Sequence, residues 1–201
     1  MIDKLTLRIS SNEKIEEFIN TIEDSTKVNH FHIDISEADG QSELLCQSSL
    51  SINSCITNEN FFKMCEKIKR LDLYNRIHLD ISSLPDVSDD WIDAISDTLK
   101  SFNPREINFN FSNSNLSDIH FEKLVYQSLK NMDNLEKLHL VMENLNITAN
   151  KMKYIEDIVE ILKSKKLNHV FLNLKRNEIY KFTLDRLNEI IGNLIIKEIY
   201  I

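Results

Sequence analysis

Glycine and proline are nearly missing from this chain of 201 residues, which contains two of each. A loop that binds phosphate needs glycines so that backbone amides can close around the anion, and here Gly40 and Gly192 stand alone. The sequence therefore excludes nucleotide-binding motifs of the Walker or dinucleotide type, and we expect no cofactor.

Cysteine is also scarce. Cys46, Cys55 and Cys65 are odd in number and form no Cys-x-x-Cys pattern, so we expect neither a disulfide framework nor a zinc knuckle. Reduced thiols are typical of a reducing compartment. The opening residues, "MIDKLTLRIS", lack the basic segment and following apolar segment of a signal peptide. These features predict a cytoplasmic protein.

An excess of positive charge and long apolar runs are lacking as well. The chain has 24 Lys and Arg residues against 32 Asp and Glu residues, a net charge of −8. Binding to nucleic acid or to an anionic membrane surface favours an excess of basic residues, so we expect neither partner. No apolar run approaches the roughly 20 residues needed to span a bilayer. The length and composition predict a single globular domain over residues 1–201.

Alternating apolar residues are the main positive signal. The stretch "HFHIDIS" at 30–36 returns as "RIHLDIS" at 76–82. An apolar residue at every second position is typical of a strand with one buried face. Predicted strands of this kind lie at Leu5–Ile9, Phe31–Ile35, Ile77–Ile81, Ile107–Phe111, Leu138–Met142, Val170–Leu174 and Ile199–Ile201. The later strands begin at Ile77, Ile107, Leu138, Val170 and Ile199, which are 30, 31, 32 and 29 residues apart.

Between the later strands, apolar residues recur every three or four positions, and this stripe predicts an amphipathic helix in each interval. Ser88, Ser117 and Thr148 stand just before three of these helices, where a hydroxyl can accept from the first-turn amides. Trp91, at the start of the first of them, is predicted to pack between helices. Each unit is thus a strand, a short loop and a helix.

Polar residues on alternate strand positions decide between two α/β architectures. Parallel strands that are covered by helices on both faces are apolar at nearly every position. The stretches "HLDIS", "NFNFS" and "HLVME" are not, so one sheet face is predicted to meet solvent. This disfavours a doubly wound sheet and favours an α/β solenoid, a curved parallel sheet with helices on its convex face only. A segment rich in Ser and Gln, at about 37–57, is predicted to be an irregular insert.

The segments "NLEKLHLVMENLNIT" and "LNHVFLNLKRNEIY", each followed by a helix, resemble leucine-rich repeats of the long, ribonuclease-inhibitor-like type. The resemblance covers residues 77–201 and extends less closely to residues 5–35. It implies a repeat surface that binds proteins by shape and by many modest contacts. Asn177 occupies the position where this family has a ladder-forming Asn. The other repeats have different residues at that position: Leu84, Ser114 and Leu145.

In such a sheet the outward side chains of successive strands form columns, with neighbours about 4.8 Å apart. The His column is predicted to contain Thr6, His32, His78, Asn108, His139, Phe171 and Tyr200. The Asp column contains Arg8, Asp34, Asp80, Asn110, Val141 and Asn173. A third column, nearer the loops, includes Ser36, Ser82, Ser112, Glu143 and Lys175.

This open face predicts a non-catalytic module that binds a protein partner or docks in a larger assembly. Aromatic and Arg side chains are the expected anchors. The insert at about 37–57 is an alternative contact, and the two edge strands, without a polar capping unit, invite pairing with a partner or a second copy. The predicted contact residues are Arg8, His32, Asp34, His78, Asp80, Asn108, Asn110, His139, Phe171, Asn173, Lys175 and Tyr200.

The paired His-x-Asp strands allow a second interpretation, a metal-binding protein or a metal-dependent enzyme that uses His32, Asp34, His78 and Asp80. Two imidazoles and two carboxylates suit a divalent transition ion. Side chains on a flat sheet diverge, however, and the sequence offers neither a nucleophile nor an oxyanion hole. We therefore predict no metal and no catalysis, and keep metal binding as the alternative.

Overall fold

The computed structural model describes residues 1–35, 56–84, 87–179, 181–192 and 196–200. Within them, seven strands form one parallel sheet, and the order of the strands in the sheet follows their order in the sequence. The strands are β1 (Ile2–Arg8), β2 (Lys27–Asp34), β3 (Asp72–Asp80), β4 (Glu106–Asn110), β5 (Lys137–Val141), β6 (His169–Asn173) and β7 (Ile196–Tyr200).

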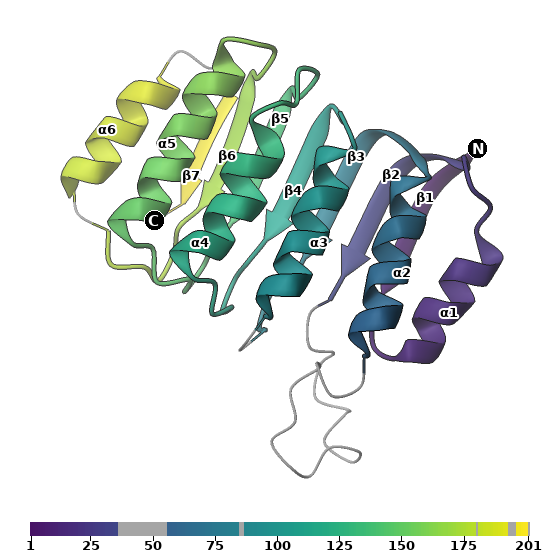
Figure 1. Cartoon of the computed structure of the whole chain (residues 1–201). Helices are drawn as coiled ribbons and strands as arrows, with labels where there is room; N and C mark the ends of the chain where they lie inside the picture. Colours follow the sequence, from purple (N-terminus) through teal and green to yellow (C-terminus); the bar gives the residue numbers. More distant parts are fainter. Residues whose placement is uncertain (36–55, 85–86, 180, 193–195, 201) are drawn as a thin grey trace, which may run out of the picture.

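The described helices all lie on the same face of this sheet, as Figure 1 shows. None of them is long and apolar enough to cross a membrane. The other sheet face carries no described helix and is called the open face below. The helical segments are α1 (Asn12–Thr21), α2 (Asn58–Lys69), α3 (Asp89–Lys100), α4 (Asp118–Phe121) with its π-helical continuation η3 (Glu122–Gln127), α5 (Ala149–Lys163) and α6 (Lys181–Ile191).

Hydroxyl side chains start the helices. The predicted N-caps are confirmed, because Ser88, Ser117 and Thr148 each accept a hydrogen bond from the backbone amide three residues later. Ser11 and Thr57 do the same for α1 and α2. Each bond satisfies an amide that has no partner inside its helix. The Ser or Thr at these five positions therefore determines where the helix begins.

The loops that follow β3 to β6 share one backbone shape. The third residue after each of these strands has positive φ, between 52° and 60°. This left-handed conformation turns the chain sharply and is easiest for Gly and Asn, and two of the four positions are Asn. The turn amides also reach the next loop, for example from Asn113 N to Glu143 O at 2.9 Å. The residues with positive φ at this position are Ser83, Asn113, Asn144 and Arg176.

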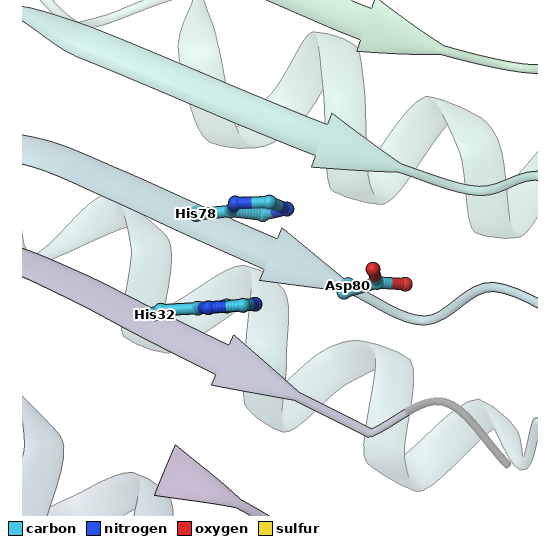
Figure 2. Close-up of side chains that lie close together, drawn as sticks. All are labelled: His32, His78 and Asp80. Atoms are coloured by element: carbon cyan, nitrogen blue, oxygen red, sulfur yellow. The ribbon is translucent and has the colours of Figure 1, made fainter. Parts of the chain in front are cut away.

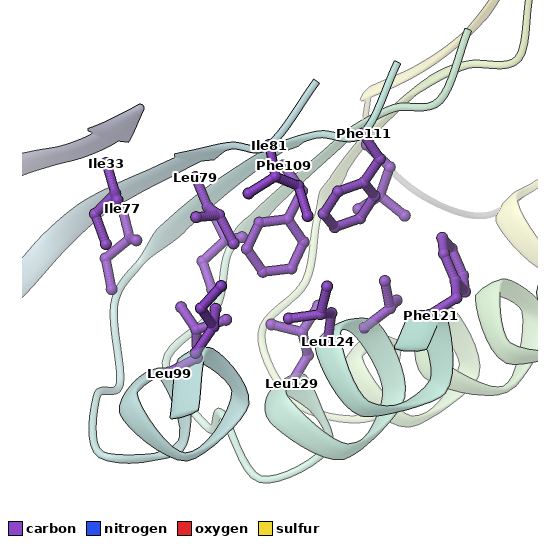
Figure 3. Close-up of a cluster of buried hydrophobic side chains, with 14 of the residues drawn as sticks. Ile33, Ile77, Leu79, Ile81, Leu99, Phe109, Phe111, Phe121, Leu124 and Leu129 are labelled. Carbon is purple, nitrogen blue, oxygen red and sulfur yellow. The ribbon is translucent and has the colours of Figure 1, made fainter. Parts of the chain in front are cut away.

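The core lies between the sheet and the helices. Figure 3 shows one part of it, where Phe109 and Phe111 of β4 point toward Phe121 and Leu124 of the α4–η3 helix. The rings of Phe111 and Phe121 meet edge to face, with centroids 5.9 Å apart. All four side chains are completely buried. The apolar side chains of each alternating strand are therefore buried against the apolar stripe of a helix, and this burial stabilises a sheet that is covered on one face only.

Trp91 shows the same principle between helices. Its ring stacks on Phe61 of α2 with a centroid distance of 4.0 Å, and its Nε1 donates to Asn58 Oδ1 at 2.9 Å. The side chain is 2% exposed. The prediction that Trp91 packs between helices is confirmed.

The predicted parallel α/β arrangement is likewise confirmed, with one correction at its last strand. The spacing placed Ile199 opposite Val170, but Val170 pairs with Lys197, and Ile199 pairs with Leu172. Strand β7 is thus displaced by two residues from the predicted register. Nearly all of the predicted insert at about 37–57 lies outside the described residues.

Candidate functional site

The pairing of the strands brings the predicted columns together on the open face. Across β2 and β3, His32 pairs with His78 and Asp34 pairs with Asp80. The His column continues through Asn108, His139 and Phe171, as predicted. It does not include Tyr200, because the displacement of β7 puts this residue opposite Asn173 in the Asp column.

Sequence reasoning missed a further column, whose residues lie two positions before those of the His column in each strand. The apolar alternation gave no signal for it, because the residue two positions before the first apolar residue of each predicted strand is polar. These residues are Asp3, Asn29, Asn75, Arg105, Glu136 and Asn168. With this basic column, five of the chain's six histidines lie on the open face. The basic column is formed by Lys4, His30, Arg76, Glu106, Lys137 and His169.

Glu106 neutralises part of the basic column. Arg76 Nη2 donates to its Oε2 at 2.8 Å, and Asn108 Nδ2 donates to its Oε1 at 3.2 Å. Burial alone would raise the pKa of Glu106, but these two hydrogen bonds outweigh it and hold the pKa below its usual value. Glu106 therefore stays ionised and ties β3 to β4.

Several predicted contact residues of the Asp column have structural roles. The Oδ1 atoms of Asp80, Asn110 and Asn173 each accept a hydrogen bond from the backbone amide two residues later, a bond that closes the turn after the strand. Asn110 Nδ2 also donates to Asp80 Oδ2 at 3.0 Å. These side chains are thus partly occupied within the sheet, and less of their polar surface is left for a partner.

Asp34 forms an ion pair with Arg8, with 2.9 Å between Oδ2 and Nε. The side chain of Asp34 is mostly buried, whereas that of Arg8 is exposed. The pair joins β2 to the edge strand β1. It directs this Asp34 oxygen toward Arg8, while the corresponding Asp80 oxygen accepts from Asn110.

Ring stacking organises the His column at two places. The imidazoles of His32 and His78 stack with centroids 4.2 Å apart and planes inclined by 15°. On the other side of Asn108, the ring of His139 stacks on Phe171 at 5.5 Å. The ring of Phe171 in turn lies 5.3 Å from that of Tyr200.

Neutral imidazoles fit this packing. Burial is the largest cause that lowers the pKa of His78, and a positive charge on His32 would lower it further, while Asp80 and Asp34 oppose the change. Burial likewise lowers the pKa of His139. Both rings therefore resist protonation more than an exposed histidine does.

His32, His78 and Asp80 form a group with donor atoms that all lie within 4.8 Å of one another. Figure 2 shows the three side chains, with both imidazoles on the same side of the two neighbouring strands. It is the single group of three His, Cys, Asp or Glu residues with this spacing in the described parts of the chain. Asp34, the fourth residue of the predicted metal set, is not in it.

Comparison of the sequence with models of known protein families finds no match, and a search among curated proteins finds no significant relative.

Proposed function

We propose that this chain is a non-catalytic protein-binding module that holds its partner on the open face of the sheet. The observation that carries this proposal is the one-sided arrangement of the described helices, which leaves the other face of the sheet without a covering helix in the described parts of the chain (Figure 1). A sheet without such a role would gain stability from covering that face, because alternate strand positions would then be apolar.

The aromatic strip, defined as His139, Phe171 and Tyr200, is the best candidate for the centre of the contact. Stacked rings are already held in place, so their ordering costs little entropy when a partner binds. Tyr200 is 43% exposed, and Lys175 Nζ lies 5.4 Å from the centre of its ring. Aromatic side chains are enriched at protein interfaces, and Tyr is among the residue types that most often contribute a large share of the binding energy.

The resemblance to long leucine-rich repeats supports the same function. We propose that the sheet is the concave face of a small solenoid. The sequential strand order, the shared loop shape and the position of Asn177 support this. Asn177 Nδ2 donates to Met142 O at 2.7 Å, and its Oδ1 accepts from Leu145 N at 2.9 Å, so it joins two successive loops.

The two edges of the sheet extend the proposal to assemblies. Strands β1 and β7 each pair on one side only within the described sheet, and an edge strand offers unpaired backbone groups to a second chain. Self-association through these edges, or docking in a larger assembly, is therefore a second use of the same module. A cytoplasmic location fits the buried free thiol of Cys65.

Quantitative affinity capture from a cell lysate tests the role of the aromatic strip. The bait proteins are the unchanged chain, Phe171→Ala, and the control Lys153→Ala, which alters an exposed residue of α5 on the helical side. We expect a defined set of proteins that Phe171→Ala captures at least about tenfold less well and the control captures equally.

A circular-dichroism spectrum of each bait excludes a folding defect as the cause. If every captured protein binds Phe171→Ala as well as it binds the unchanged chain, the aromatic strip is not the contact. Sedimentation of the unchanged bait tests the edges, because a monomer at every concentration would contradict self-association.

A further inference from the structure

The His32, His78 and Asp80 group has a donor set that partner binding does not require. Two neutral imidazole nitrogens and one carboxylate are ligands that Zn²⁺ and related divalent ions take in proteins, often with a fourth position left for water. The three side chains come from strands that are directly paired, so the backbone holds their Cα atoms in fixed positions.

We propose that His32, His78 and Asp80 form a binding site for a divalent transition-metal ion, with Zn²⁺ as the best-fitting ion. The ion would connect β2 to β3, the strands on either side of the longest connection in the described sheet. This site does not depend on the proposed partner, and it lies apart from the aromatic strip.

One imidazole nitrogen already lacks a partner. His32 Nε2 is buried and has no hydrogen bond to any residue that the structure describes. A buried polar atom without a partner costs free energy, and coordination of an ion would remove that cost.

Asp80 has the supporting contacts of a metal-bound carboxylate. Its Oδ1 accepts from Ser82 N at 3.0 Å, and its Oδ2 accepts from Asn110 Nδ2 at 3.0 Å. Such hydrogen bonds orient a ligating carboxylate and still leave a lone pair on each oxygen. Asp34 is less suitable, because its Oδ2 is paired with the guanidinium of Arg8.

Binding requires a small change in the two rings. A bound ion lies close to the plane of each imidazole, and planes inclined by 15° at a separation of 4.2 Å do not meet near the rings. At least one ring must therefore rotate about its Cβ–Cγ bond, a torsion with a broad energy minimum. The donor atoms, now within 4.8 Å, must also approach to about 3.3 Å, which tetrahedral geometry sets for zinc.

The chain itself supplies conservative variants for a test. The neighbouring strand β4 has Asn108 in register with His78 and Asn110 in register with Asp80. Asn110 closes its turn through the same side-chain bond as Asp80 does. The substitutions His78→Asn and Asp80→Asn therefore give β3 the polar side chains of β4 and are compatible with the fold.

The experiment is calorimetric titration of ZnCl₂ into the full chain after removal of any purification tag. We expect one ion per chain, with affinity reduced at least about tenfold by His78→Asn and by Asp80→Asn. The matched control is His139→Asn, which alters a second histidine pair on the same face. Its rings, His139 and His169, have centroids 4.9 Å apart, and Val141 stands where β3 has Asp80.

The control should bind zinc as the unchanged chain does. Absence of stoichiometric binding would overturn the proposal. So would binding that survives both β3 substitutions, because groups outside this cluster, such as the thiols of Cys46 and Cys55, would then hold the ion. Circular-dichroism spectra of the variants establish that lost binding is not lost folding.

Discussion

At the scale of single residues, burial is the largest cause of the lowered pKa values of His78 and His139 on the open face. His139 Nε2 is buried and has no hydrogen bond to a described residue. Burial is the largest cause of its lowered pKa, and the carboxylate of Glu106 opposes the change. The remaining charged neighbours, which lower the pKa further, are His169, Arg76 and Lys137.

Acid should destabilise the fold through His139. The unfolded chain takes up a proton on this residue near its ordinary pKa, whereas the folded chain does so only at lower pH. The free energy of unfolding therefore decreases as the pH falls from about 7.5 to about 5.5, and the contribution is complete below the folded pKa. Urea unfolding at both ends of this range measures the decrease, which we expect to be smaller in His139→Asn.

The variant keeps a side chain that the fold accepts, because Asn108 occupies the equivalent position in β4. An equal decrease in the unchanged chain and in the variant would show that His139 is protonated alike in both states.

Alternation made the burial of strand residues predictable, but not that of charged helix residues. Sequence alone places Lys151 in the first turn of an amphipathic helix, where lysine is usually exposed. In the structure it is 3% exposed, and its Nζ donates to the carbonyls of Leu145 and Asn146 in the preceding loop. Those carbonyls come within reach because of the loop's path, which no spacing rule describes.

At the scale of elements, the most informative departure is the π-helical segment η3. The apolar stripe predicted a helix here. It could not predict the wider π-helical turn, because a side chain of the neighbouring helix α3 bonds to the backbone of that turn. Ser128 Oγ donates to Lys123 O at 2.8 Å, and Ser96 Oγ of α3 donates to the same oxygen at 3.0 Å. The two hydroxyls also lie 3.0 Å apart. Such turns are rare and depend on side chains that satisfy the backbone.

A double-mutant cycle on Ser96 and Ser128 measures this coupling. The two hydroxyls have one proton each for three close contacts, so one donates to Lys123 O and the other donates either to that oxygen or to its partner hydroxyl. Each single change to Ala removes one of these donors, and we expect each to cost about 1–2 kcal/mol of unfolding free energy. The double variant should cost less than the sum by about 1 kcal/mol, because any bond between the two hydroxyls is already lost in either single variant.

Urea unfolding gives all four values. Ser164→Ala is the control, since its hydroxyl bonds to Ile161 O in an exposed position, and it should change stability by less than about 0.5 kcal/mol. Strictly additive costs would mean that the hydroxyls act independently.

Strand β7 shows the limit of pattern reasoning for elements. In the segment "IKEIYI" the alternation fixes which residues face the helices, but a shift of two residues preserves that face. The predicted pairing of Ile199 with Val170 was one such shifted solution. Tyr200 consequently lies beside Asn173, although its ring still reaches Phe171.

At the scale of the whole molecule, one continuous apolar core lies between the sheet and the helices, and it includes the strands β2 and β3 and the helices α2 and α3. A small apolar cavity of about 20 Å³ lies among the side chains of β2, β3, α2 and α3, and Cys65 is part of its wall. Burial raises the pKa of the Cys65 thiol to about 11. A thiol of this kind is inert until the surrounding elements separate.

Alkylation of Cys65 should therefore report global unfolding. In a Cys46→Ser/Cys55→Ser variant it is the single thiol of the chain. At pH about 8, iodoacetamide should react with the folded chain at least about 100-fold more slowly than with the unfolded chain, because the thiolate fraction alone differs by that factor. We expect protection to be lost at the same urea concentration as the fluorescence change of Trp91, the single tryptophan.

The fluorescence of Trp91 serves as the internal reference, because its ring packs on Phe61 in the same helix that carries Cys65. Alkylation at much lower urea than the fluorescence change would instead indicate that the N-terminal strands open locally.

The sequential pairing of the strands has a mechanical consequence. Because β1 and β7 are the opposite edges of the sheet, tension applied between them would act across the row of strands (Figure 1). It would break the backbone hydrogen bonds of one strand pair after another and would not shear all of them at the same time. A molecule attached to partners at both edges would then lengthen in steps under modest force and shorten again when the force is removed.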